Sequence, residues 1–138
     1  MNILLALDGS EHSLRAVEHT ALLLQNFANS TCTMVFVDQM AKKGTGKAPE
    51  IFEEVANEEM RKNLEKAQEI LNEKGLLYTT KVLAGNDVAE IVCKYAKQRH
   101  FSQIVLGTRG LGNLRGIVMG SVSHKVLQLA PCPVTFVK

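Results

Sequence analysis

Short apolar runs alternate with stretches of helical periodicity along the whole chain, and this alternation constrains the fold more than any other feature. The apolar runs lie at 2–7, 32–38, 77–83, 103–107 and 133–137. The last two are nearly continuous in apolar character and rich in β-branched residues, which is typical of strands buried on both faces. The order β-α-β-α-β-α-β-α-β predicts a parallel sheet with helices on both faces and right-handed crossovers.

Four amphipathic patterns fill the spaces between these runs. Each has one apolar stripe at helical spacing; the stripes run from Leu14 to Leu24, Ala56 to Leu71, Val88 to Ala96 and Met119 to Leu129. We expect the second of these helices to span 49–74, with its many charged residues forming a solvated face. The polar, glycine-bearing loop at about 39–48 precedes it, and we expect this loop to be flexible. It is either a solvated surface loop or a loop that covers a ligand or partner.

Length and composition exclude several classes of protein. With 138 residues, the chain suits a single domain, 1–138, and 46% hydrophobic residues exclude general disorder. A net charge of +2 gives no electrostatic case for nucleic-acid binding. No apolar run approaches the roughly 18 residues of a membrane span, and the N-terminus reads as a first strand, not a signal peptide. We therefore expect neither a nucleic acid nor a membrane as a partner.

The three cysteines, Cys32, Cys93 and Cys132, show no C-x-x-C spacing. An odd count without such spacing argues against a disulfide framework and against a zinc site. We expect reduced, mostly buried thiols in a cytoplasmic protein, with a redox role for Cys93 or Cys132 as the alternative.

A glycine-rich stretch, 107–121, follows the fourth expected strand and leads into the last helix. It holds five of the ten glycines of the chain. Glycines let backbone N–H groups approach an anion, and a helix N-terminus adds free donors and a positive dipole end. Ser121 can cap this helix or donate to a phosphate, and Arg109 either adds positive charge or is a solvated surface residue. The stretch has the profile of a phosphate cradle.

The familiar phosphate-binding motifs do not account for this stretch. Gly46-Lys47 matches the end of a Walker A loop, but Ala41 and Ala48 stand where that motif needs glycine and Ser or Thr. The dinucleotide fingerprint fails on glycine spacing, on its place after the fourth strand, and on the acidic residue it requires downstream.

A different spacing does fit. Gly107-x2-Gly110-x9-Gly120-Ser121 matches the G-2x-G-9x-G-(S/T) pattern of ATP-binding universal stress proteins. The opening Ile3-Leu4-Leu5-Ala6-Leu7-Asp8-Gly9-Ser10 and the closing Pro131-Cys132-Pro133-Val134 also resemble that family. The resemblance covers the whole chain.

The resemblance implies an α/β fold with an open five-stranded parallel sheet in the order 3-2-1-4-5, of the Rossmann-like or adenine nucleotide alpha hydrolase-like kind. It places Ala6 and Asp8 near adenine and ribose, with Val37 packing on the base. Ribose and phosphates would be lined by Gly107, Gly110, Gly120, Ser121 and Val122, with Arg109 inside the loop. Two alternatives stay open: Asp8 caps the first helix with Ser10, and Val37 belongs to the core.

The implied function is an ATP-binding universal stress protein, a nucleotide-dependent stress-response or signalling module. It would be no enzyme beyond slow ATP hydrolysis, with Mg²⁺ or Mn²⁺ bound mainly through the phosphates. An ATP-hydrolysing or adenylate-transferring enzyme is the alternative, and an interaction module without nucleotide is a third reading. The family's pairing of its last strand implies a homodimer through 133–137, and an unidentified protein partner is a further expectation.

Overall fold

The computed structural model describes residues 1–39, 49–108 and 119–138. Most of the loop at 39–48, together with Arg109 and Gly110, lies outside the described residues. The helices and strands are β1 (Asn2–Leu7), the short 3₁₀ helix η1 (Glu11–Ser13), α1 (Leu14–Asn26), β2 (Thr31–Asp38), the 3₁₀ helix η2 (Phe52–Glu54), α2 (Glu58–Glu73), β3 (Tyr78–Ala84), α3 (Val88–Gln98), β4 (Gln103–Gly107), α4 (Ser121–Leu129) and β5 (Val134–Val137).

The five strands form one sheet in the order β3-β2-β1-β4-β5, and every neighbouring pair is parallel. This confirms the fold class and the strand order that the resemblance implied. Each expected strand is present within one residue of its expected bounds. The central strand β1 lies between β2 and β4, so that Ala6 is in register with Val35 on one side and with Leu106 on the other.

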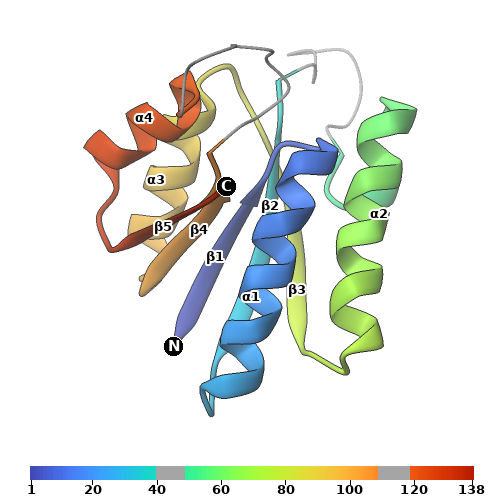
Figure 1. The fold of residues 1–138 in the computed structure, drawn as a ribbon. Coiled ribbons are helices and arrows are strands. Elements are labelled where there is room, and N and C mark those ends of the chain that lie inside the picture. The colour runs from blue at the N-terminus through green and yellow to red at the C-terminus, as the bar shows by residue number, and fades with distance from the viewer. Residues whose placement is uncertain (40–48, 109–118) are drawn as a thin grey trace.

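Helices α1 and α2 cover one face of the sheet, and α3 and α4 cover the other (Figure 1). Side chains alternate across β1, so Leu5 and Leu7 pack with α1 and α2, while Leu4 packs with α3 and α4. Both faces of the central strand are therefore buried, which explains its continuous apolar sequence. Full burial of each such leucine stabilises the fold by about 1.5–3 kcal/mol.

The helix expected over 49–74 is shorter than these bounds and begins at Glu58. A separate turn of 3₁₀ helix comes first, and the backbone is extended at Val55 and Asn57. The Asn57 side chain accepts a hydrogen bond from the Met60 amide at 3.0 Å, which makes Asn57 the N-cap of α2. Asparagine favours this position because its side chain replaces the missing partner of a first-turn amide. The expected start at 49 was wrong, because the helix begins only after this cap, close to where the apolar stripe itself begins at Ala56.

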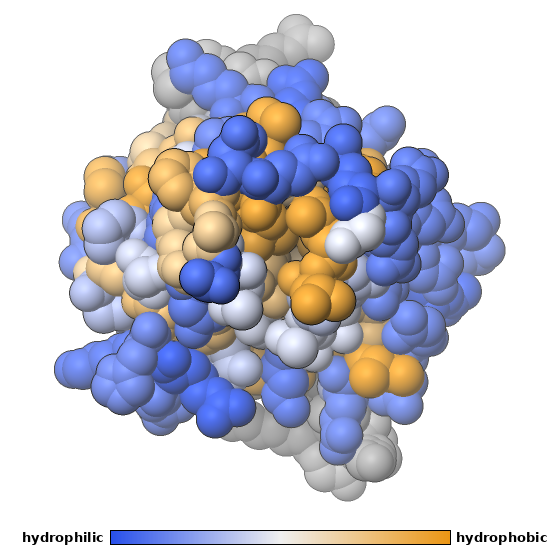
Figure 2. Space-filling model, turned by 90° about the horizontal axis from the view of Figure 1, so that it is seen from below, coloured by the Kyte–Doolittle hydropathy of each residue, from blue (hydrophilic) through white to orange (hydrophobic). Residues whose placement is uncertain are grey.

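The amino ends of the strands lie together at one end of the molecule, at the bottom of the view in Figure 1. Seen from that end, apolar groups gather near the middle of a largely hydrophilic outline (Figure 2). Across residues 1–39, 49–108 and 119–138, every helix is too short or too polar to cross a bilayer.

Candidate functional site

The carboxyl ends of β2, β1 and β4 meet at one edge of the sheet. Because Ala6 is in register with Val35 and Leu106, the residues two positions further on, Val37, Asp8 and Thr108, follow at the same level. In an open parallel sheet, ligands bind at this edge, where the strand order reverses. The reversal falls here between β1 and β4, as the strand order implied by the resemblance requires.

Hydrogen bonds join the end of β4 to the start of α4. The Gly120 amide donates to the Thr108 carbonyl at 2.8 Å, and the Thr108 amide donates to the Val137 carbonyl at 2.8 Å. The Ser123 hydroxyl donates to the Gly107 carbonyl at 2.9 Å. The two described ends of the glycine-rich stretch, Gly107 and Gly120, are thus held close together beside β1.

The N-terminus of α4 has no side-chain cap within the described part of the chain. Gly120 is its N-cap residue, whereas Asn57 and Asp87 cap α2 and α3 through their side chains. Ser121 is therefore the first helical residue and not the cap, and both Ser121 and Val122 are exposed. The first amides of α4 have no partner within the helix, which leaves donors and a positive dipole end for an anion.

Gly120 does not need to be glycine for the sake of the backbone. Its φ of −71° is open to any residue. A Cβ added there would lie 3.5 Å from the Thr108 carbonyl oxygen, which is ordinary van der Waals contact. The space that a side chain would enter adjoins the first amides of α4. A group seated on these amides would use that space, so the residues present fit a bound phosphate.

Asp8 makes local hydrogen bonds directly after β1. Its Oδ1 accepts from the Ser10 amide at 2.9 Å and from the Ser10 hydroxyl at 2.5 Å. Ser10 in turn caps η1 by accepting from the Ser13 amide. Ser10 is therefore the capping residue, and Asp8 binds Ser10 through one carboxylate oxygen without capping the helix itself. The other oxygen, Oδ2, forms no hydrogen bond among the described residues, which leaves it available to a ribose hydroxyl.

Ala6 and Val37 lie on the same face of the sheet, the face covered by α3 and α4. Val37 is 6% exposed and belongs to the core cluster, while Ala6 is half-buried and packs against that cluster. Val37 is thus a core residue, as its alternative interpretation held. Its place at the carboxyl edge, level with Asp8, is the place expected of a residue that borders a base.

Two contacts between α3 and α4 escaped the sequence analysis. Lys125 forms ion pairs with Asp87 and, at 3.3 Å, with Glu90. The hydrogen bond from Lys125 holds the pKa of Asp87 below its ordinary value. No local sequence signal could reveal a pair of residues 38 positions apart. Because Lys125 is paired with two carboxylates, we assign its charge to the contact between α3 and α4.

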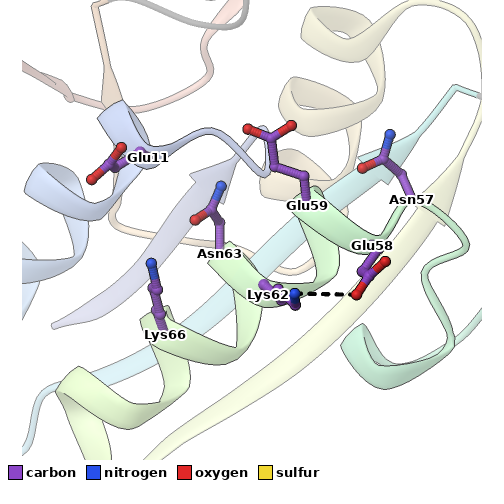
Figure 3. A pocket seen from close by; sticks show the side chains of 7 residues that line it. All are labelled: Glu11, Asn57, Glu58, Glu59, Lys62, Asn63 and Lys66. Atoms are coloured by element: carbon purple, nitrogen blue, oxygen red, sulfur yellow. Dashed lines mark ion pairs between the residues drawn. The ribbon is translucent and has the colours of Figure 1, made fainter.

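A pocket lies between η1 and the first turns of α2, beside the loop that follows β1 (Figure 3). It has a volume of about 630 Å³ and is lined by Glu11, Asn57, Glu58, Glu59, Lys62, Asn63 and Lys66. Lys62 pairs with Glu58 at 3.1 Å, and the Asn63 amide group donates to the Gly9 carbonyl at 3.0 Å. Its side chains carry charges of both signs, which does not favour a phosphate. Asn63 instead fixes the loop that follows Asp8.

The cysteines and the metal-ligating residues are dispersed. Cys32, Cys93 and Cys132 are free thiols, and burial raises the pKa of Cys32 to about 12. Burial also raises the pKa of Cys93 and of Cys132, so these thiols are weak nucleophiles. Over residues 1–39, 49–108 and 119–138, no three His, Cys, Asp or Glu side chains come together as metal ligands would.

This fold is also found in known proteins. The strand order and the surrounding helices define a Rossmann-like α/β fold. Two solved structures share it over nearly the whole chain: a universal stress protein in complex with cAMP (TM-score 0.71, 18% identity, 99% of this chain and 95% of that one) and a universal stress protein family protein from Arabidopsis thaliana with AMP bound (TM-score 0.70, 22% identity, 100% and 91%).

The sequence itself matches the universal stress protein family over residues 1–138. It is 36% identical over 146 aligned residues to universal stress protein YxiE of Bacillus subtilis, covering 99% of this chain and 97% of that protein. The chain belongs to the universal stress protein family.

Proposed function

We propose that this protein binds ATP at the carboxyl edge of its sheet and acts as a nucleotide-dependent stress-response or signalling module. The observation that carries the proposal is the uncapped N-terminus of α4, which Gly120 and Thr108 join to the end of β4 beside β1. Two universal stress proteins of the same fold hold cAMP and AMP, which supports an adenine nucleotide as the ligand class.

Each proposed site residue that the structure describes has a role in this proposal. Ser121 and Val122 present their amides, and Gly107 and Gly120 line the phosphates without side chains. Asp8 accepts from the ribose through Oδ2, and Ala6 and Val37 border the base. Arg109 and Gly110 complete the proposed set and lie outside the described residues. Mg²⁺ or Mn²⁺ would bind mainly through the phosphates and water, where it would neutralise phosphate charge.

We propose binding, with at most slow hydrolysis, as the main activity. Amide donors at a helix N-terminus stabilise phosphate charge in the ground state, and turnover needs a positioned nucleophile and base as well. In the described part of the chain, no serine or cysteine is hydrogen-bonded to a histidine. An ATP-hydrolysing or adenylate-transferring enzyme remains the competing function, and the experiment below separates the two.

The test begins with the protein as purified, without added nucleotide. The protein is denatured, the precipitate is removed, and nucleotides in the supernatant are identified by chromatography and mass. Near-stoichiometric ATP, lost in Gly120→Val, is the expected result. ADP or AMP in its place would favour the enzyme. An empty supernatant followed by no heat of binding on titration with ATP and Mg²⁺ would overturn nucleotide binding and leave an interaction module.

We also propose a homodimer through 133–137, in the cytoplasm. The edge strand β5 pairs with β4 on one side, and its other backbone edge is available to a second copy. The three free thiols are consistent with a reducing compartment. An unidentified protein partner would bind this dimer differently with and without nucleotide.

A further inference from the structure

Ser123 lies in the first turn of α4 and is 5% exposed. It is not part of the glycine motif, and no sequence pattern selects it. Its hydroxyl donates a hydrogen bond of 2.9 Å to the Gly107 carbonyl, the last residue of β4. A buried hydroxyl thus joins the first turn of α4 to the strand end at the proposed phosphate site.

The carbonyl that Ser123 binds lies just past the last paired position of β1 and β4. Ala6 and Leu106 form the final pair in that register, and Gly107 follows. On the other side of β4, the Thr108 amide donates to Val137. Ser123 therefore supplies a partner to the Gly107 carbonyl at the point where β1 and β4 separate, which is the switch point of the sheet.

The contact holds the first turn of α4, whereas the rest of the helix is held by Val126 in the core and by the ion pairs of Lys125. Backbone bonding holds the N-cap residue, since the Gly120 amide donates to Thr108. A single bond at the N-cap would still allow the first turn to pivot about it. The Ser123 bond adds a second point of attachment three residues further along the helix. Two points of attachment define where the amides of Ser121, Val122 and Ser123 point.

We propose that Ser123 is a positioning residue for the nucleotide phosphates. Its hydroxyl does not bind the ligand, because that donor is committed to Gly107 and the side chain is buried. It acts by holding the first amides of α4 in the orientation that the phosphates need before they arrive. Preorganisation of this kind increases affinity because less ordering is left for the binding step. The inference rests on the proposed binding of ATP at this site.

The experiment compares three variants with the wild type by calorimetric titration with ATP and Mg²⁺. Ser123→Ala leaves the Gly107 carbonyl without its partner, and we expect affinity to fall about tenfold. Ser123→Thr keeps the hydroxyl and is expected to restore affinity to within about twofold. Ser102→Ala is the control, because the Ser102 hydroxyl also donates to a carbonyl at 2.9 Å, that of Asn2, at the opposite end of β1. It is expected to leave affinity unchanged.

A second measurement does not depend on the ligand. Hydrogen exchange of the Gly120 and His124 amides, both bonded at the start of α4, reports whether the first turn is held. We expect faster exchange at these amides in ligand-free Ser123→Ala and wild-type rates there in Ser123→Thr and Ser102→Ala. Equal rates in Ser123→Ala and the wild type would overturn the positioning role.

The remaining outcomes separate this inference from the function on which it rests. A wild type that binds ATP while Ser123→Ala binds equally well would overturn the role of Ser123 and leave the proposed function intact. Equal losses in Ser123→Ala and Ser102→Ala would assign the effect to general stability and would also overturn it. A wild type that binds no ATP would overturn the proposed function, and the positioning role with it.

Discussion

At the scale of single residues, two glycines with similar backbone conformations differ in their surroundings. Gly9 follows Asp8 with a φ of +75°, and a Cβ there would lie 2.8 Å from the Met60 Cβ. Gly75 follows α2 with a φ of +64° and would meet nothing within 4 Å. Both positions favour glycine for its left-handed conformation, but only Gly9 also needs it for close packing of the first loop on α2.

This difference predicts unequal costs for the same substitution. Gly75→Ala should lower the free energy of unfolding by about 1–2 kcal/mol, the cost of a left-handed conformation with a Cβ. Gly9→Ala should lower it by about 2–5 kcal/mol, because overpacking against Met60 is added. Urea unfolding followed by circular dichroism measures both values. Equal losses would show that the contact with Met60 relaxes without cost.

Gly120 gives the opposite case, because neither its conformation nor its contacts require glycine. Gly120→Ala should therefore leave the urea midpoint close to that of the wild type. A methyl group beside the first amides of α4 would intrude on the bound phosphates, and we expect affinity for ATP to fall at least about tenfold. Calorimetric titration measures the affinity. A stable variant with wild-type affinity would contradict the position proposed for the phosphates.

At the scale of elements, α3 and α4 are joined by Lys125 with Asp87 and Glu90, side chains that are 40–64% exposed. The pKa of Asp87 is lowered and that of Lys125 is raised by this contact. A lowered carboxyl pKa stabilises the fold above the unfolded pKa, about 4, and this contribution is lost as the pH falls through the folded value. A raised lysine pKa stabilises the fold below about 10 and is lost above the folded value.

We therefore expect Lys125→Met to be less stable than the wild type between about pH 5 and pH 9, and the difference to shrink as the pH falls below about 4. Urea midpoints across this range test the prediction. The control is Lys62→Met, which removes an exposed i, i+4 pair with Glu58 within one helix and should change the midpoint little. A Lys125→Met deficit that does not change with pH would point to lost packing of the lysine stem in place of lost charge.

At the scale of the whole molecule, the two edge strands of the sheet, β3 and β5, differ in what we propose for them. Val134 on β5 and Leu83 on β3 are both partly buried, and both pack on the core between the sheet and α3 and α4. Because only β5 is proposed to pair across a two-fold axis, these two positions form a matched pair for testing assembly.

Val134→Lys should shift the protein from dimer to monomer in sedimentation velocity, since a charge at this edge opposes strand pairing. Leu83→Lys carries the same charge at the other edge and should leave the dimer in place. Circular dichroism establishes that both variants are folded under the conditions of sedimentation. An unchanged dimer in folded Val134→Lys would contradict assembly through 133–137.

The periodicity of the sequence was enough to predict the strands, their order of appearance and the sheet edge at which we propose that the ligand binds. Continuous apolar runs such as 103–107 can be stable only with both faces covered, and this requirement selects a parallel sheet between helices. The glycine spacing, through resemblance, added the strand order and the residues at the switch point. These properties depend on local patterns and on the rules of chain connection, so a single sequence carries them.

The contacts between segments distant in the chain could not be predicted from local patterns. The start of α2 at Asn57, the ion pairs of Lys125, and the bond from Ser123 to Gly107 depend on which side chains the fold brings together. The structure likewise showed that one Asp8 oxygen binds Ser10 and that Val37 lies in the core. The polarity of a residue determines what kind of partner it needs. Which residue becomes that partner depends on packing in three dimensions.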